Sequence, residues 1–297
     1  MRLSYLILLI VLNFFWAGSL SIYKVLADYV APGGIATLRF GTAALLLLAL
    51  WPVYSGKAPR GRDLWKTALM GLVVFTLGHR IQVLGVKLGT AGNSAVLMGV
   101  EPILTSVAAA LFLREHIGPR RWLGFGLGLL GVAVLNRFQW AGLAASLIFV
   151  SCFICEAFYS IMGKPLIERA GAMKILTLAL LIGTAANLLI DGRQTFGEAR
   201  AMPAHLWWLV AYLSIICTAV GYGVWFLVIQ ESDVNIVALT IFAQPVAGLI
   251  IAVIWLHERL HWGHLWGSLA IVAGLIVGLS RQIKVRGQDR FTGRDAP

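Results

Sequence analysis

The sequence is poor in charge. Only 12% of its 297 residues are charged, while 59% are hydrophobic and the mean hydropathy is +0.85. Soluble domains carry about 25% charged residues, so this chain has too few to cover a surface that faces water. The shortage excludes a soluble globular protein. It favours an all-α integral membrane protein with the lipid bilayer as a partner.

Acidic residues and cysteines are scarcer still. The chain has 13 acidic and 24 basic residues, which gives a net charge of +11. In a soluble protein this excess would indicate nucleic acid; here we expect no nucleic acid and assign the charge to loops at the anionic cytoplasmic surface. The three cysteines lie in apolar runs and predict no disulfide framework. The chain has no G-x-x-x-x-G-K-[ST] loop, so direct use of ATP is excluded, and no cofactor is predicted.

Long apolar runs are what the chain has instead. A bilayer core of ~30 Å needs about 20 apolar residues per helix, and ten segments are predicted to cross it: 3–26, 33–54, 64–86, 90–113, 119–136, 141–163, 173–190, 205–229, 234–256 and 263–280. The stretch from Asp191 to Ala204 is the longest predicted loop. Residues 282–297 are expected to form a basic cytoplasmic tail.

One stretch is written twice. Residues 102–131 return at 245–274, and an offset of 143 aligns Pro, Leu, Glu and two Gly residues without a gap. An internal repeat determines the architecture before any other feature does. The sequence therefore predicts two five-helix repeats, over 1–138 and 139–281.

The basic residues predict the orientation. With a cytoplasmic N-terminus, sixteen Lys and Arg residues lie inside, six lie outside, and Arg39 and Arg80 lie within the membrane. Five helices per repeat is an odd number, so the second repeat enters from the opposite face and both termini are cytoplasmic. Inverted repeats are typical of alternating access, with a substrate site near mid-membrane where the halves meet.

The chain resembles a known family. The resemblance covers about residues 5–281 and is carried by residues of the first two helices and by the repeated helices: Asn13 to Ser19, Lys24, Pro32, Arg39, Pro102, Leu113, Glu115, Trp122, Gly124 and Gly131. These residues are similar to those of the ten-helix EamA-type branch of the drug/metabolite transporter (DMT) superfamily. The resemblance implies a secondary transporter in the bacterial inner membrane that exports amino acids, related metabolites or drugs through a cavity between the halves. His79 and Arg80 depart from the family pattern.

Glu101 and Gln244 are the first site candidates. Ionisable groups within the membrane are costly and functional by default, and Glu101 directly precedes Pro102. A proline inside a helix frees the carbonyl four residues earlier, here that of Met98, and such breaks are tolerated along a cavity. The repeat places Gln244 and Pro245 at the equivalent point. We expect Glu101 and Gln244 to flank the site, one from each half.

The role of Arg80 has two readings. By depth along the helices, Arg80 falls within reach of Glu101. Either the two form a structural ion pair, or they open to engage the substrate, with Glu101 as the site of a coupling proton. His79 is a candidate beside them.

Further candidates come from the first, second, sixth and eighth predicted helices. Arg39 is expected to be structural or gating, paired with Asp28 or extended toward the surface. Glu156 coincides with Asn13 under the 143-residue offset, so both are expected to face the cavity. Trp16, Tyr222 and Trp225 are candidate aromatic walls; packing is the competing interpretation for each.

Two further patterns are weighed against simpler explanations. His257-Glu258-x-x-His261 satisfies the H-E-x-x-H signature of a zinc protease, but the repeat already accounts for Glu258 as the counterpart of Glu115. We therefore predict a transporter and no enzyme, with uniport, exchange or import without proton coupling as the alternative within transport. Small-xxx-small glycines in 119–136 and 263–280 predict close helix packing, either inside the chain or in a homodimer.

Overall fold

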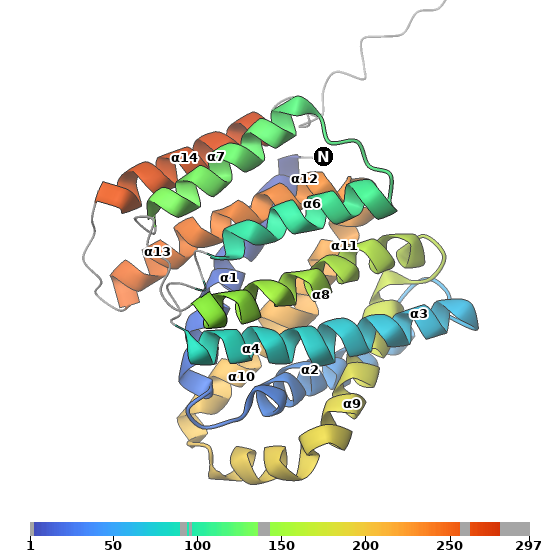
Figure 1. Ribbon diagram of the computed structural model, residues 1–297. Helices are drawn as coiled ribbons and strands as arrows, with labels where there is room; N and C mark the ends of the chain where they lie inside the picture. Colours follow the sequence, from blue (N-terminus) through green and yellow to red (C-terminus); the bar gives the residue numbers. More distant parts are fainter. Residues whose placement is uncertain (1–2, 90–93, 95–96, 136–142, 256–261, 280–297) are drawn as a thin grey trace, which may run out of the picture.

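The computed structural model describes residues 3–89, 94, 97–135, 143–255 and 262–279, and in these ranges every regular element is helical (Figure 1). The elements of the first half are α1 (Leu3–Leu26), α2 (Pro32–Ala49), η1 (Trp51–Val53), α3 (Arg62–Met70), η2 (Gly71–Gly78), α4 (His79–Leu88), η3 (Met98–Val100), α6 (Glu101–Phe112) and α7 (Pro119–Leu135).

The second half has the same order of long and broken helices. Its elements are α8 (Leu143–Ile167), α9 (Ala172–Ala201), η4 (Ala204–Leu206), α10 (Trp207–Ser214), η5 (Ile215–Val220), α11 (Gly221–Glu231), α12 (Val234–Leu239), η6 (Thr240–Phe242), α13 (Ala243–Trp255) and α14 (Trp262–Leu279). Short connections and apolar runs favour helices because a helix satisfies its backbone groups internally in lipid.

Six helical stretches of the described chain are long and apolar enough to cross a bilayer, which confirms the predicted multi-pass helical class. They are Leu3–Leu26, Pro32–Ala49, Arg62–Leu88, Leu147–Ile167, Ala172–Ala201 and Ala204–Glu231. The other predicted segments coincide with α6, with α7, with α12 to α13 and with α14.

Two helices change pitch at equivalent places. The π-helical stretches η2 and η5 begin at Gly71 and Ile215. The offset of 143 residues places the equivalent of Gly71 at position 214, one residue before the start of η5. Wider π turns leave carbonyls that need other partners, and Asn187 Nδ2 donates to Phe75 O in η2 at 3.1 Å. The same irregularity therefore occurs in both halves.

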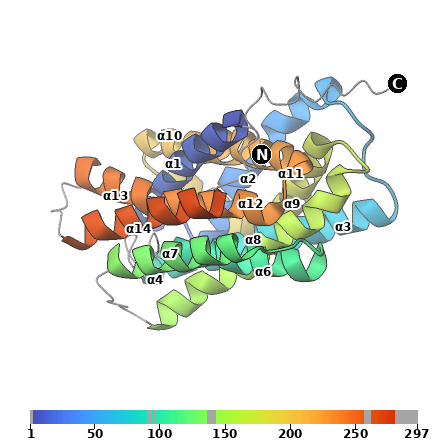
Figure 2. The same cartoon turned by 90° about the horizontal axis from the view of Figure 1, so that it is seen from above.

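Helices α7 and α14 lie side by side along their length (Figures 1 and 2). A Cβ added to Gly124 would lie 2.8 Å from Gly274 O, and one added to Gly131 would lie 2.6 Å from Gly267 O. Only glycine permits this approach of two backbones. The predicted contact between these helices is confirmed as one inside the chain.

The predicted loop from Asp191 to Ala204 is wrong over most of its length. Helix α9 continues to Ala201, with a kink at Asp191, whose φ and ψ are −143° and 24°. The polar residues read as a loop support a helix instead, because Gln194 Nε2 donates to Glu198 Oε1 one turn later at 2.8 Å. Glu198 also accepts a hydrogen bond from Ala31 N at 2.9 Å.

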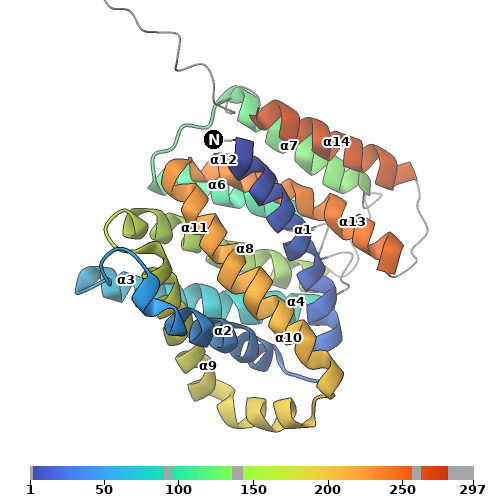
Figure 3. The ribbon, with the colours of Figure 1, turned by 180° about the vertical axis from the view of Figure 1, so that it is seen from behind.

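Three connections meet at one end of the helical bundle: those between α2 and α3, between α6 and α7, and between α8 and α9 (Figure 3). Gly171 N donates to Lys57 O at 2.9 Å, and Lys174 Nζ donates to Gly56 O at 2.9 Å. At the opposite end, Lys24 Nζ donates to the carbonyl of Gly89 at 2.8 Å. The first end gathers most of the described basic residues that the charge count assigns to the cytoplasm.

Candidate functional site

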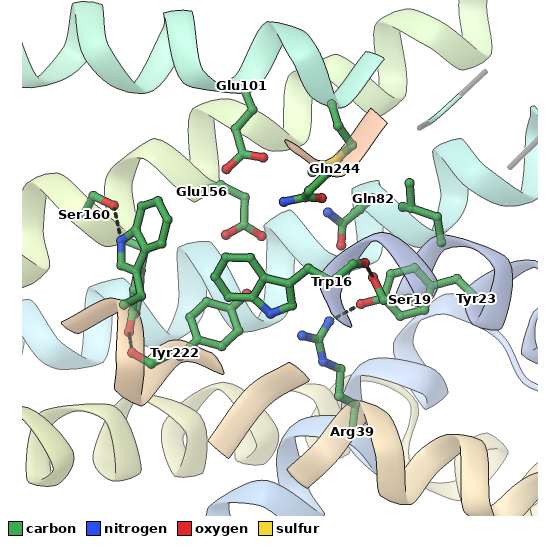
Figure 4. A pocket seen from close by; sticks show the side chains of 14 residues that line it. Trp16, Ser19, Tyr23, Arg39, Gln82, Glu101, Glu156, Ser160, Tyr222 and Gln244 are labelled. Atoms are coloured by element: carbon green, nitrogen blue, oxygen red, sulfur yellow. Dashed lines mark hydrogen bonds between the residues drawn. The ribbon is translucent and has the colours of Figure 1, made fainter. Parts of the chain in front are cut away.

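A polar cavity lies among helices of both halves (Figure 4). Its volume of about 60 Å³ has room for several water molecules. Fourteen side chains line it: Trp16, Ser19, Leu20, Tyr23, Arg39, Gln82, Met98, Glu101, Glu156, Tyr159, Ser160, Tyr222, Trp225 and Gln244. Two carboxylates and one guanidinium face this small cavity inside an apolar bundle. Ionisable groups are costly in such surroundings, so the cavity is the candidate site.

Glu101 reaches the cavity from the start of α6. The chain before it is a 3₁₀ turn, and the Glu101 N–H donates to the Met98 carbonyl. The prediction that Pro102 frees the Met98 carbonyl is therefore wrong, because the tighter turn supplies another donor. Pro102 lies in the first turn of α6, where its missing N–H costs no helical hydrogen bond. Neither Pro102 nor Pro245 lines the cavity.

The side chain of Gln244 is held in place by a hydrogen bond to Asn13, on the side away from the cavity. Gln244 Nε2 donates to Asn13 Oδ1 at 2.9 Å, and Asn13 Nδ2 donates to Leu9 O at 2.7 Å and to Thr240 Oγ1 at 3.2 Å. Asn13 is fully buried and does not line the cavity. The structure thus brings Glu101, Glu156 and Gln244 to one cavity and places Asn13 one layer behind them.

Arg39 lies on the opposite wall from Glu101 (Figure 4). Its Nε donates to Thr218 Oγ1 at 2.7 Å, its Nη1 donates to the Tyr23 hydroxyl, and its Nη2 donates to Cys217 O at 3.4 Å. The predicted pairing with Asp28 is wrong, because neutral groups of α1 and η5 take these donors. The guanidinium also packs over the Phe40 ring at 4.9 Å.

Three of the predicted aromatic residues line the cavity. Trp16 lies 5.8 Å from Trp225 and 5.9 Å from Tyr222, measured between ring centroids. Each indole N–H has a partner, since Trp16 Nε1 donates to Cys217 O at 2.8 Å and Trp225 Nε1 donates to Ser160 Oγ at 3.0 Å. The rings are therefore fixed across helices α1, α8 and α11.

Arg80 and His79 do not line the cavity. Arg80 Nη2 lies 2.8 Å from Asp191 Oδ1, and its Nε donates to Asn187 Oδ1 at 2.7 Å. The predicted Arg80–Glu101 ion pair is wrong, because the polar residues at the kink of α9 reach Arg80 instead. His79 is buried between the rings of Tyr23 and Phe40, with centroid distances of 5.1 and 4.7 Å.

Several lining residues were missed by sequence reasoning. Ser19 and Tyr23 lie three and seven residues after Trp16, so a helical repeat from Trp16 would have found both. Gln82 and Ser160 carry no charge, so in the sequence they give a weaker signal than the ionisable candidates. All four line the cavity.

The comparisons with known proteins agree with the resemblance. The model of the EamA-like transporter family matches residues 3–137 and 142–279. The chain belongs to the EamA-like transporter family. A transporter named YdfC from Bacillus subtilis, described as uncharacterized, is 25% identical over 267 residues, which covers 88% of this chain and 86% of the relative.

Two further comparisons extend the likeness over nearly the whole chain. A probable terminal-alkyne amino-acid exporter from Streptantibioticus cattleyicolor is 24% identical over 288 residues, with 94% of each protein covered. A protein of known crystal structure superposes with a TM-score of 0.73 at 18% identity, covering 95% of this chain and all of that one. This second likeness concerns the fold alone.

As an EamA-family chain, the protein is a transporter and a multi-pass membrane protein. The His257-Glu258-x-x-His261 pattern lies outside the described residues. Within the described ranges, no group of three or more His, Cys, Asp or Glu side chains could hold a metal ion. What the cavity offers chemically is two carboxylates, one fixed guanidinium, amide groups and aromatic walls.

Proposed function

We propose that this protein is a secondary transporter that exports small metabolites carrying an amino group, amino acids among them, by alternating access through the cavity. The observation that carries the proposal is the cavity itself, because its charged and amide side chains come from both halves of the chain: Glu101, Arg39 and Gln82 from the first, and Glu156 and Gln244 from the second. Opposite charges on opposite walls suit a zwitterion. The relative that is named a probable amino-acid exporter supports the same substrate class.

The architecture we propose has ten spans in two inverted five-helix repeats, 1–138 and 139–281, followed by the basic tail. Support comes from the two family-model matches and from the pitch changes at equivalent places in both halves. Both termini lie at the cytoplasmic side of a bacterial inner membrane. The gathering of Lys57, Lys164 and Lys174 at one end supports this orientation. A homodimer would form through surfaces other than the glycine faces of α7 and α14, because those faces pack against each other within the chain.

Export requires an energy source, and we assign the coupling proton to Glu101. A carboxylate in a cavity of low dielectric can exchange a proton between the two sides as the cavity opens to each in turn. Import or exchange without proton coupling is the alternative. It predicts transport that ignores a pH gradient.

The test is counterflow in proteoliposomes loaded with a mixture of unlabelled L-amino acids, with uptake of labelled amino acids measured at each of several imposed pH gradients. We expect accumulation that rises with the gradient in the wild-type protein and becomes independent of it in Glu101→Gln. Glu168→Gln, which removes an exposed carboxylate outside the cavity, is the matched control and should behave as wild type. Absence of counterflow for every amino acid would overturn the proposed substrate class, and a Glu101→Gln variant that still follows the gradient would overturn the assignment of the proton.

A further inference from the structure

The two cavity carboxylates have no partner in the part of the protein that the structure describes. Within the described ranges, neither Glu101 nor Glu156 makes a hydrogen bond or an ion pair with another residue, although both face the same cavity (Figure 4). Other carboxylates of the bundle are engaged: both oxygens of Glu115 accept hydrogen bonds, and Asp191 Oδ1 pairs with Arg80. Buried charges are normally paired and hydrogen-bonded. Two unpaired carboxylates in one cavity therefore indicate that their partner is a ligand.

The charge count of the cavity leaves room for one cation. Arg39 is the only cationic residue among the described lining, and within the described residues its hydrogen-bond partners are all neutral: the Tyr23 and Thr218 hydroxyls and the Cys217 carbonyl. Its charge is thus free to balance one carboxylate across the cavity. The second carboxylate has no fixed counter-charge, so a bound ligand would neutralise it.

The hydrogen-bond chain behind Gln244 defines which end of its amide faces the cavity. Asn13 Nδ2 donates to the Leu9 carbonyl, which can only accept, so Asn13 Oδ1 must point toward Gln244. Gln244 therefore presents its nitrogen to Asn13 and keeps its Oε1 for the cavity. The side chain is 4% exposed, and within the described residues its Oε1 has no partner.

We propose that Glu101, Glu156 and Gln244 form a subsite for a primary ammonium group, R–NH₃⁺. An ammonium has three N–H donors and no acceptor, and the three side chains offer acceptors from α6, α8 and α13. One carboxylate comes from each half, so closing the halves around the ligand brings both to the same nitrogen. The inference rests on the proposed transport function and deepens it, because it defines which group of the substrate the protein selects.

The aromatic walls provide the competing arrangement. Trp16, Tyr222 and Trp225 could hold a cation by cation–π attraction alone, which suits a quaternary ammonium that has no N–H. An acceptor subsite and an aromatic cage therefore predict opposite preferences between a primary amine and its trimethylated form. This difference does not depend on knowing the natural substrate.

The experiment uses three probes with one skeleton: 2-phenylethylamine, its N,N,N-trimethyl derivative and 3-phenylpropanoate. Each is titrated against the full-length protein in detergent near neutral pH, with the shift in Tm giving an apparent Kd. We expect the primary amine to bind about tenfold tighter than the trimethyl compound, as the loss of hydrogen bonds to charged acceptors implies. The anion should give no shift.

Matched variants locate the effect. Glu101→Gln and Glu156→Gln should each weaken binding of the primary amine about tenfold, whereas Glu168→Gln should leave it unchanged. Gln244→Met removes the third acceptor without a change of charge, so it should weaken the primary amine and spare the trimethyl compound. Gln244→Met also tests the subsite if a carboxylate variant fails to fold.

Three results would overturn the subsite. They are equal or tighter binding of the trimethyl compound, a preference for the primary amine that survives both Glu101→Gln and Glu156→Gln, and no binding of the primary amine at all. Each leaves the proposed transport function to its own test, because amino-acid counterflow is measured without these probes. Counterflow together with an overturned subsite would mean that the cavity transports its substrate without selecting an amine in this way.

Discussion

The carboxylates at one end of the bundle and those in the cavity differ in whether the protein supplies them with hydrogen-bond and ion-pair partners. At one end, Glu115 is 2.7 Å from Lys164 Nζ, and it accepts hydrogen bonds from Val234 N at 2.9 Å and from Asn235 N at 3.1 Å. In the cavity, within the described residues, Glu101 and Glu156 have no such partner. All of these groups are carboxylates of an apolar chain, and only the surroundings differ.

The difference separates groups that hold the fold from groups kept ready for a ligand. Glu115 joins the two halves by bonding at once to α8 and to the N-terminus of α12, whose first N–H groups have no helical acceptor. A carboxylate there also lies favourably at the positive end of a helix dipole. Within the described residues, Glu101 and Glu156 make no contact of this kind, which is the arrangement expected if they bind a ligand.

The strongest test of the comparison is removal of the most engaged carboxylate. Glu115→Ala should lower the free energy of unfolding by about 3–5 kcal/mol, because it leaves the partly buried Lys164 charge without its carboxylate and two N–H groups of α12 without an acceptor. The measurement is denaturant or thermal unfolding of the purified protein in detergent. Glu168→Ala, at an exposed position nearby, should change little. Equal effects of the two substitutions would contradict the structural role of Glu115.

A smaller loss is expected at the ion pair beside the kink of α9. Asp191→Asn keeps the shape and removes the charge that faces Arg80, whose side chain is 23% exposed against 15% for Asp191. We expect a loss of about 1–3 kcal/mol in the free energy of unfolding, as for a charged hydrogen bond. Asp28→Asn is the control, because Asp28 is exposed and does not pair with Arg39. If Asp28→Asn were the more damaging substitution, the positions of both arginines would be in error.

The smallest effect on stability is expected in the cavity. Glu101→Gln and Glu156→Gln remove a charge that has no partner in the described protein, so neither loses a native contact. Because an unpaired charge is costly in an apolar interior, Tm should stay constant or rise slightly. Thermal unfolding without ligand measures this directly. A fall in Tm comparable with that of Glu115→Ala would show that these carboxylates hold the fold after all.

Much of the lining of the candidate cavity could be predicted from the sequence, because polar residues are rare in apolar helices. Glu101, Glu156 and Gln244 were found for this reason, and Trp16, Tyr222 and Trp225 were found with them. The errors concern both the lining and the partners: Asn13, His79 and Arg80 were expected at the cavity and do not line it. Arg80 was paired with Glu101 and Arg39 with Asp28, since depth along a helix can be counted from the sequence but the facing side chain cannot. Ser19 and Gln82 were missed because uncharged polar groups give a weaker signal.

The sequence by itself determined the helical membrane class, the repeat at an offset of 143 residues and the family, because apolar length and periodicity act locally along the chain. Tertiary structure alone decided which charges are satisfied. Asp191 meets Arg80, Glu115 meets Lys164, and Glu101 and Glu156 are left facing a shared cavity. The reason is that each partner lies on a different element of the chain, and helix packing brings the two together. Glu115 and Lys164, for example, are 49 residues apart in the sequence.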